Sequence, residues 1–172
     1  MNAMELPNEY AARLERLEKL KAQGIDPYPA NVSRSHTSAE FLSQFEALAK
    51  KNTIVNIVGR VRSLRPHGGS TFGHIEDGTG PVQLFFQRDT LGADPYNQLF
   101  AALDVGDFIA ASGVPYTTRR GEKSLQIQHA RIISKTLLPL PEKWHGLSDV
   151  EVRYRKRYLD LIMNDSVREI FR

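Results

Sequence analysis

Apolar residues recur at helical spacing in two stretches near the N-terminus. The first covers residues 8–23 and ends before Gly24, with its stripe at Tyr10, Leu14, Leu17 and Leu20. A second helix is predicted from Thr37, because Thr37 and Glu40 have the spacing of a capping box. Its stripe consists of Phe41, Leu42, Phe45 and Leu48. Both stripes favour packing on a neighbouring surface, and we assign residues 1–52 to an N-terminal helical extension.

At Thr53 the pattern changes to that of strands. Five short runs rich in β-branched and aromatic residues are separated by turn residues or a helix, at positions 54–64, 71–76, 81–87, 107–115 and 124–133. A helix beginning at Asp94-Pro95 lies between the third and fourth runs. This order is that of a five-stranded OB barrel, and Gly59 suits the sharp bend of so small a barrel. We therefore predict an all-β OB-fold barrel over residues 53–136, with a helix between strands 3 and 4.

Prolines punctuate residues 137–148, which we interpret as a linker or hinge. Residues 149–172 return to helical spacing and predict a C-terminal helical segment. Its cluster at residues 153–158 alternates basic and aromatic side chains, which suits either a nucleic-acid patch or a helix that docks on a further domain. Because the sequence stops inside this segment, we expect the chain to be part of a longer protein.

Composition narrows the class of protein. With 41% hydrophobic and 25% charged residues the chain is typical of a globular protein, and no apolar run reaches the ~20 residues that span a bilayer. The sequence has no cysteine, and its five histidines lack ligand spacing, so we expect no metal site. The N-terminus is unlike a signal peptide, and we expect a cytoplasmic protein without a membrane. A net charge of only +3 means that any nucleic-acid site needs locally concentrated positive charge.

Candidate base-binding residues lie on the predicted strands. An exposed Phe72 would offer a base a stacking surface, Gln83 can match the donor and acceptor of a uracil edge, and Arg65 can donate to a base or a phosphate. Glu122, between strands 4 and 5, can accept from a neighbouring base. Possible phosphate contacts are Arg119, Arg120 and Lys123. The alternatives are a core phenylalanine, a solvated glutamine and an exposed hairpin tip.

Several motifs carry a family resemblance. GRVRSLRPHG, EDGTGPVQLFF and GEKSLQI, in that order, resemble the anticodon-binding domain of the lysyl-, aspartyl- and asparaginyl-tRNA synthetases. RLEKLKAQGIDPYP, which ends at residue 29, looks like the N-terminal helix and turn of the lysyl-tRNA synthetases. KTLLPLPEKWHGLSDVEVRYRKRYLDLI, residues 135–162, resembles that family's hinge and its approach to class II motif 1.

The resemblance implies a role for each candidate. Phe72 falls where the family stacks the middle anticodon base, a uracil, and Arg65 and Gln83 fall where it hydrogen-bonds that base. Glu122 falls where it contacts the third anticodon base. Gly69 departs from the family, many members of which carry a lysine there for a phosphate contact. Residues 149–172 would be the start of the class II catalytic domain, which favours the docking interpretation of that segment.

The resemblance also implies a reaction. The full-length enzyme would be a lysine–tRNA ligase that forms lysyl-adenylate from lysine and ATP with Mg²⁺ and then transfers lysine to tRNA(Lys). It would act as a homodimer. The residues for this chemistry would lie beyond Arg172, so we expect these residues to bind the tRNA anticodon loop, to hold no cofactor or metal, and to have no catalytic residue.

Two other classes of protein fit the same pattern. A sequence-tolerant single-strand binder would use the same barrel without an enzyme, although the low net charge and the motif-1-like C-terminus disfavour it. A related OB-bearing protein, such as a synthetase paralogue or an aspartyl or asparaginyl enzyme, would share the barrel and differ in the sequence that follows.

Overall fold

The computed structural model describes residues 6–141, 147 and 149–171. The chain divides into two compact units, Met1–Leu138 and Pro139–Arg172. This division falls inside the linker predicted from its prolines, and residues 142–146 and 148 of that linker lie outside the described part. The domain limits at residues 52, 136 and 148 stay predictions.

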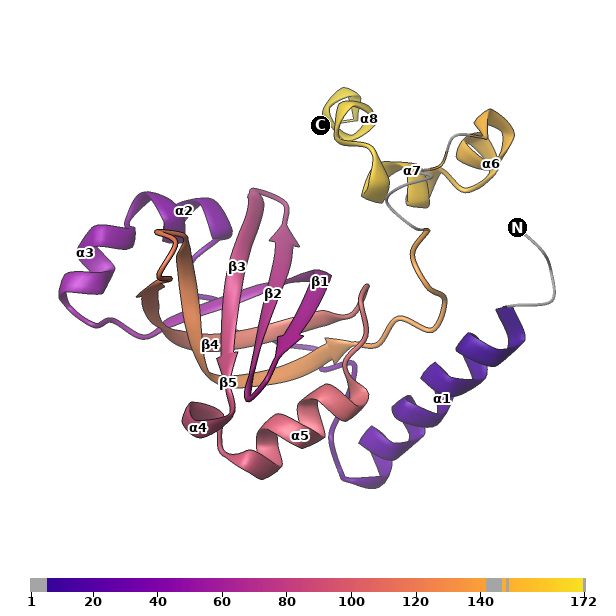
Figure 1. The fold of residues 1–172 in the computed structure, drawn as a ribbon. Helices are drawn as coiled ribbons and strands as arrows, with labels where there is room; N and C mark the ends of the chain where they lie inside the picture. The colour runs from indigo at the N-terminus through magenta and orange to yellow at the C-terminus, as the bar shows by residue number, and fades with distance from the viewer. Residues whose placement is uncertain (1–5, 142–146, 148, 172) are drawn as a thin grey trace. The chain divides into compact units, whose positions relative to one another are not determined.

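Five strands of the first unit close into a barrel (Figure 1): β1 (Val55–His67), β2 (Ser70–Asp77), β3 (Gly80–Gln87), β4 (Phe108–Thr117) and β5 (Lys123–Ser134). Their order around the barrel is β1-β2-β3-β5-β4. Neighbouring strands are antiparallel except for β3 and β5, which run parallel. The OB-fold barrel predicted from the strand order is thereby confirmed.

The first strand bends so that it can serve two neighbours. Its first half pairs with β4 up to Arg60, and its second half pairs with β2 from Arg60 onward, with a bulge between Val61 and Ser63. At Gly59 an added Cβ would lie 3.0 Å from the Glu76 carbonyl oxygen. Any other residue would force the two strands to move apart, so glycine suits this position. The predicted role of Gly59 in the bend agrees with this close approach.

Every second side chain of the strands points into the barrel and fills it. A helix between β3 and β4 packs against this core and covers one end of the barrel. Leu84, Phe86 and Ile127 are fully buried within it. The rings of Phe86 and Phe100 meet edge to face at 5.2 Å, which packs the helix α5 (Ala93–Ala102) against the core. The helix predicted between β3 and β4 is α5. A short helix α4 (Arg88–Leu91), which was not predicted, precedes it, and Gly92, with φ 88°, redirects the chain between them.

Two short helices, α2 (Ser38–Ser43) and α3 (Phe45–Lys50), replace the one predicted from Thr37. The capping box is present, since the Thr37 side chain accepts from the Glu40 N–H and the Glu40 side chain accepts from the Thr37 N–H. The helix is interrupted at Gln44, whose φ of −97° and ψ of 6° depart from helical values. Because α2 contacts β3 and α3 contacts β4, the interruption lets the apolar stripe follow the curved barrel.

An aspartate at the β2–β3 turn fastens α2 to the barrel. Asp77 accepts from the backbone N–H of Ser38 at 2.8 Å and from the N–H and hydroxyl of Thr79 at 2.7 and 2.6 Å. Burial on its own would raise the pKa of Asp77. The hydrogen bonds from Thr79 and Ser38 outweigh that effect and hold the pKa below its ordinary value.

Buried charges fasten the N-terminal helix α1 (Leu6–Ala22) to one end of the barrel. Arg13 is only 5% exposed and donates to the carbonyls of Val105 and Thr136 at 3.2 and 3.1 Å. Beside it, the fully buried side chain of Lys135 donates to Asp107 at 2.7 Å and also pairs with Asp104. The predicted helix is confirmed, and ionic contacts supplement its apolar stripe.

Among its described residues, the second unit has three short helices, α6 (Val150–Arg155), α7 (Arg157–Met163) and α8 (Asp165–Ile170). The predicted C-terminal segment is helical, but Lys156 and Asn164 leave the helical backbone and divide it. The fully buried carboxylate of Asp160 accepts from Arg153 at 3.0 Å and from Arg157 at 2.6 Å. Two cations of the predicted basic cluster are therefore neutralised within the unit.

Candidate nucleic-acid interface

The predicted base-binding residues lie on the outer face of β1, β2 and β3. Strand register aligns Arg65 with Phe72 and Phe72 with Phe85 in one row across these strands. A second row contains Ser63, His74 and Gln83. These side chains point away from the barrel core, since their strand neighbours such as Leu84 and Ile75 fill it. We refer to these six residues as the outer face.

Three aromatic rings stack face to face on this side of the barrel. The Phe72 and Phe85 ring centroids lie 4.8 Å apart, the Phe85 and Tyr116 centroids lie 5.0 Å apart, and both ring pairs are inclined by 20°. Phe85 is covered on both faces, whereas Phe72 ends the series and is half-buried. The Phe72 ring, predicted to be exposed, is therefore half-buried and held on one face by Phe85, and Phe72 is not a core residue.

The amide of Gln83 is enclosed. Its residue is 6% exposed, and its Nε2 has no hydrogen-bond partner among the residues that the structure describes. The alternative of a solvated strand residue is wrong for Gln83. A buried amide nitrogen without an acceptor costs roughly 1–3 kcal/mol, which a ligand would recover once the Gln83 side chain turns outward to meet its acceptor. No such cost is attached to Arg65, which is exposed.

Parallel pairing of β3 with β5 brings the β4–β5 turn close to the outer face. The turn is closed by hydrogen bonds between Thr118 and Glu122 and between Thr118 and Gly121, which has a φ of 84°. At its end Oε1 of Glu122 lies 3.4 Å from Nε2 of His74. All four residues predicted to recognise bases therefore lie on or beside one surface.

The three predicted phosphate contacts differ in their surroundings. Arg119 and Arg120 are exposed at the tip of the β4–β5 turn and have no ion-pair partner in the described part of the chain. Lys123 instead faces α3, where it lies 3.1 Å from a Glu46 carboxylate oxygen and 5.1 Å from the centroid of the Phe45 ring. The positive charge that the turn offers to a polyanion is therefore mainly that of its two arginines.

Sequence reasoning missed several residues of this surface. His74 follows Phe72 by two positions on one strand, so period-two alternation could have placed it on the same face. Phe85 could have been found in the same way from Gln83. Tyr116 had no such signal, because its ring reaches Phe85 only through the pairing of β5 with both β3 and β4.

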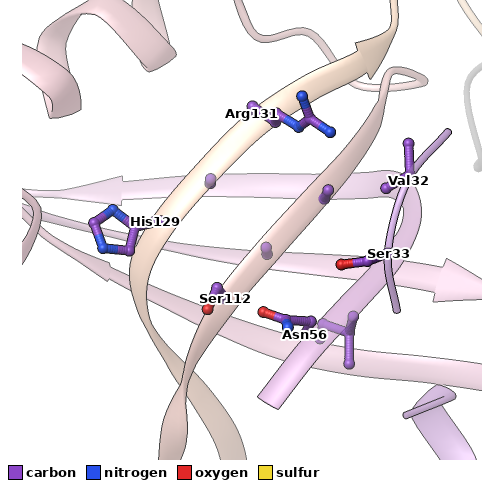
Figure 2. A pocket seen from close by; sticks show the side chains of 10 residues that line it. Val32, Ser33, Asn56, Ser112, His129 and Arg131 are labelled. Carbon is purple, nitrogen blue, oxygen red and sulfur yellow. The ribbon is translucent and has the colours of Figure 1, made fainter. Parts of the chain in front are cut away.

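A separate hollow of about 230 Å³ opens on β1, β4 and β5 (Figure 2). Ser112 and His129 line it from the sheet, and the segment at Val32 and Ser33 lines one side of it. No carboxylate lines it, so it lacks the paired titratable groups of acid–base chemistry. Within residues 6–141, 147 and 149–171 no group of three or more potential metal-ligating side chains gathers. In the same residues no helix has the length and apolar character to cross a membrane.

The region that matches a known protein family has nearly the same bounds as the barrel. Residues 55–133 match the family described as OB-fold nucleic acid binding domain, of the tRNA anticodon type. The matched residues coincide with the five strands of the closed barrel. The OB domain thus spans β1 to β5 and includes the outer face and the β4–β5 turn.

Similarity extends beyond the OB domain to almost the whole chain. The lysine–tRNA ligase of Carboxydothermus hydrogenoformans is 45% identical over 99% of this chain and 34% of its own length. That of Chloroflexus aurantiacus is 46% identical over 98% of this chain and 35% of its own length. That of Dehalococcoides mccartyi strain 195 is 45% identical over 96% of this chain. The chain is homologous to lysine–tRNA ligases and spans about a third of the length of these relatives.

Proposed function

We propose that the OB domain recognises the anticodon loop of tRNA(Lys) as part of a lysine–tRNA ligase. In this proposal Phe72 stacks on a middle uracil, Arg65 and Gln83 hydrogen-bond its edge, and Glu122 accepts from the third base. The observation that carries the proposal is Gln83, an amide enclosed beside an aromatic series with an unpartnered nitrogen. Similarity to lysine–tRNA ligases over nearly the whole chain supports the choice of tRNA.

Hydrogen bonding on the outer face would select the base. A uracil edge presents a donor, N3–H, beside the O4 acceptor, and the amide of Gln83 supplies the matching acceptor and donor. An amide turned over would match cytosine equally well, so Gln83 alone does not separate the pyrimidines. Arg65 has donors only, which favour the uracil carbonyl over the cytosine amine. With Arg65 donating to O4, the Gln83 carbonyl oxygen accepts from N3–H, and cytosine cannot match this arrangement of donors and acceptors.

Stacking and charge would supply the rest of the affinity. A base stacked on Phe72 gains about 1–3 kcal/mol, and the ring is already braced by Phe85 before the base arrives. Arg119 and Arg120 would contact the phosphates of the loop, with Lys123 a weaker contributor because Glu46 holds it. A site with so few phosphate contacts predicts a shallow dependence of binding on salt.

Catalysis by the whole ligase belongs to the same proposal. The ligase would activate lysine with ATP and Mg²⁺, act as a homodimer in the cytoplasm and transfer lysine to tRNA(Lys). The described residues do not fit a metal site, since no suitable group of side chains gathers among them. The contribution that we propose for the described residues is anticodon recognition.

Binding of anticodon stem-loops to the 172-residue chain tests the proposal. Stem-loops that differ only in the middle base are titrated by fluorescence anisotropy. We expect Gln83→Ala to reduce the preference for a middle uracil about tenfold or more, since a discriminating hydrogen-bonded pair is worth roughly 1–3 kcal/mol. Phe72→Leu should weaken binding and Phe72→Tyr should retain it, because only tyrosine keeps the ring.

An exposed glutamine on α5 provides the matched control. Gln98→Ala should leave both affinity and base preference unchanged, because Gln98 is exposed on α5 and borders α1 rather than belonging to the outer-face strands. Equal binding of a stem-loop with a middle purine by the wild-type chain would contradict anticodon recognition. Equal binding joined to a steep salt slope would instead identify a sequence-tolerant single-strand binder.

A further inference from the structure

His74 occupies the centre of the outer face. Strand register places it between Ser63 on β1 and Gln83 on β3, and it follows Phe72 by two positions on β2. It is half-buried, so its ring neither belongs to the core nor moves freely in solvent. The imidazole therefore lies among all the groups proposed to bind the middle base.

Both ring nitrogens of His74 have partners. Nδ1 lies 3.2 Å from the Ser63 hydroxyl oxygen, and Nε2 lies 3.4 Å from Oε1 of Glu122. In the neutral ring a serine hydroxyl that donates to Nδ1 leaves the proton on Nε2. That N–H can then donate to the carboxylate. Because an ionised carboxylate only accepts, Glu122 selects this tautomer, and the Ser63 hydroxyl, which can donate or accept, then donates to Nδ1.

Glu122 depends on this contact for its position. Its side chain is 54% exposed at the end of a turn, and among the described residues His74 is the partner of its carboxylate. Its backbone N–H bonds to Thr118, which fixes the main chain but leaves the side-chain rotamer open. A long exposed glutamate without a side-chain partner samples several rotamers and would contact a base only part of the time.

We propose that His74 is a positioning residue that holds Glu122 over the outer face and thereby sets discrimination at the third anticodon base. The proposal rests on the anticodon-binding function proposed above. His74 acts through Glu122 and does not itself select a base. It links the site of the middle base to that of the third base, because the same ring is the cross-strand neighbour of Gln83.

Two substitutions of similar size separate the two nitrogens. His74→Gln places an amide donor near the position of Nε2 and keeps the contact with Glu122. His74→Asn places its amide near Nδ1 and Ser63 and loses that contact. For each 172-residue variant we would measure the affinity ratio of stem-loops with uracil or cytosine in the third anticodon position, and the ratio for the middle base.

We expect His74→Asn to reduce the third-base ratio roughly threefold to tenfold, which is what the loss of one net hydrogen bond gives. His74→Gln should keep the ratio within about twofold, and both variants should keep the middle-base ratio. In a Glu122→Gln background His74→Asn should change the ratio no further. A wild-type ratio in His74→Asn, or a further loss in that background, would overturn the positioning role.

Side-chain dynamics without RNA separate this proposal from the one on which it rests. NMR relaxation of the Glu122 side-chain methylenes should show increased motion in His74→Asn and wild-type motion in His74→Gln. If the wild-type chain fails to prefer a middle uracil, the anticodon function fails and the positioning role in base choice fails with it. If that preference holds and Glu122 is equally mobile in the wild type and both variants, the positioning role alone is refuted.

Discussion

The stacked series of Phe72, Phe85 and Tyr116 predicts that one buried ring supports both stability and binding. Phe85 is 9% exposed, and its two ring neighbours have centroids 4.8 and 5.0 Å away. Phe85→Leu keeps an apolar side chain of moderate size but removes both ring pairs. Each aromatic pair is worth about 0.5–1.5 kcal/mol beyond burial, so the free energy of unfolding should fall by about 1–3 kcal/mol.

Urea unfolding of the 172-residue chain, followed by circular dichroism, measures this loss. A double-mutant cycle with Tyr116→Leu should give a coupling of about 0.5–1.5 kcal/mol, one of the two pairs. Binding of an anticodon stem-loop should weaken, because Phe72 loses its brace, while the preference for a middle uracil persists. A coupling near zero with unchanged unfolding would refute the reasoning that the three rings act as a series.

Three further changes test the structure away from the outer face, each by thermal or urea unfolding. Lys135→Met should lower stability by about 3–5 kcal/mol, because the buried Asp107 carboxylate loses its paired cation and keeps only two backbone N–H donors, and adding Asp107→Asn should restore part of the loss. Gly113→Ala should cost at least about 3 kcal/mol, because its Cβ would lie 2.0 Å from a backbone oxygen of β5, whereas Gly78→Ala, with no atom within 4 Å, should cost far less. Asp77→Asn should cost about 1–3 kcal/mol at neutral pH. Since the pKa of Asp77 is lowered in the fold, its stabilisation is present above the ordinary aspartate pKa and lost as pH falls through the lower value, and the asparagine variant should lack that pH dependence.

Local patterns in the sequence determined the elements of this protein. Thr37 and Glu40 predicted a cap that the structure contains, since a capping box needs only groups three residues apart. Alternation and turn residues predicted five strands in OB order, and Phe72 was predicted on the surface. The interruption at Gln44 was not predicted, because it depends on how α2 and α3 pack on curved strands that are distant in sequence.

Only the tertiary structure decided how the candidate residues meet. The parallel pairing of β3 with β5 puts Glu122 beside His74, and nothing local to either residue specifies that pairing. The same pairing sets Gln83 opposite Ser124, and the Gln83 residue is buried. The packing of α3 against β4 brings Glu46 to Lys123, so a lysine predicted to contact phosphate also forms an ion pair. The sequence on its own determined which groups were available, because spacing sets which face each one occupies. Long-range strand pairing decided their partners, because burial and hydrogen bonding depend on chains brought together from distant positions.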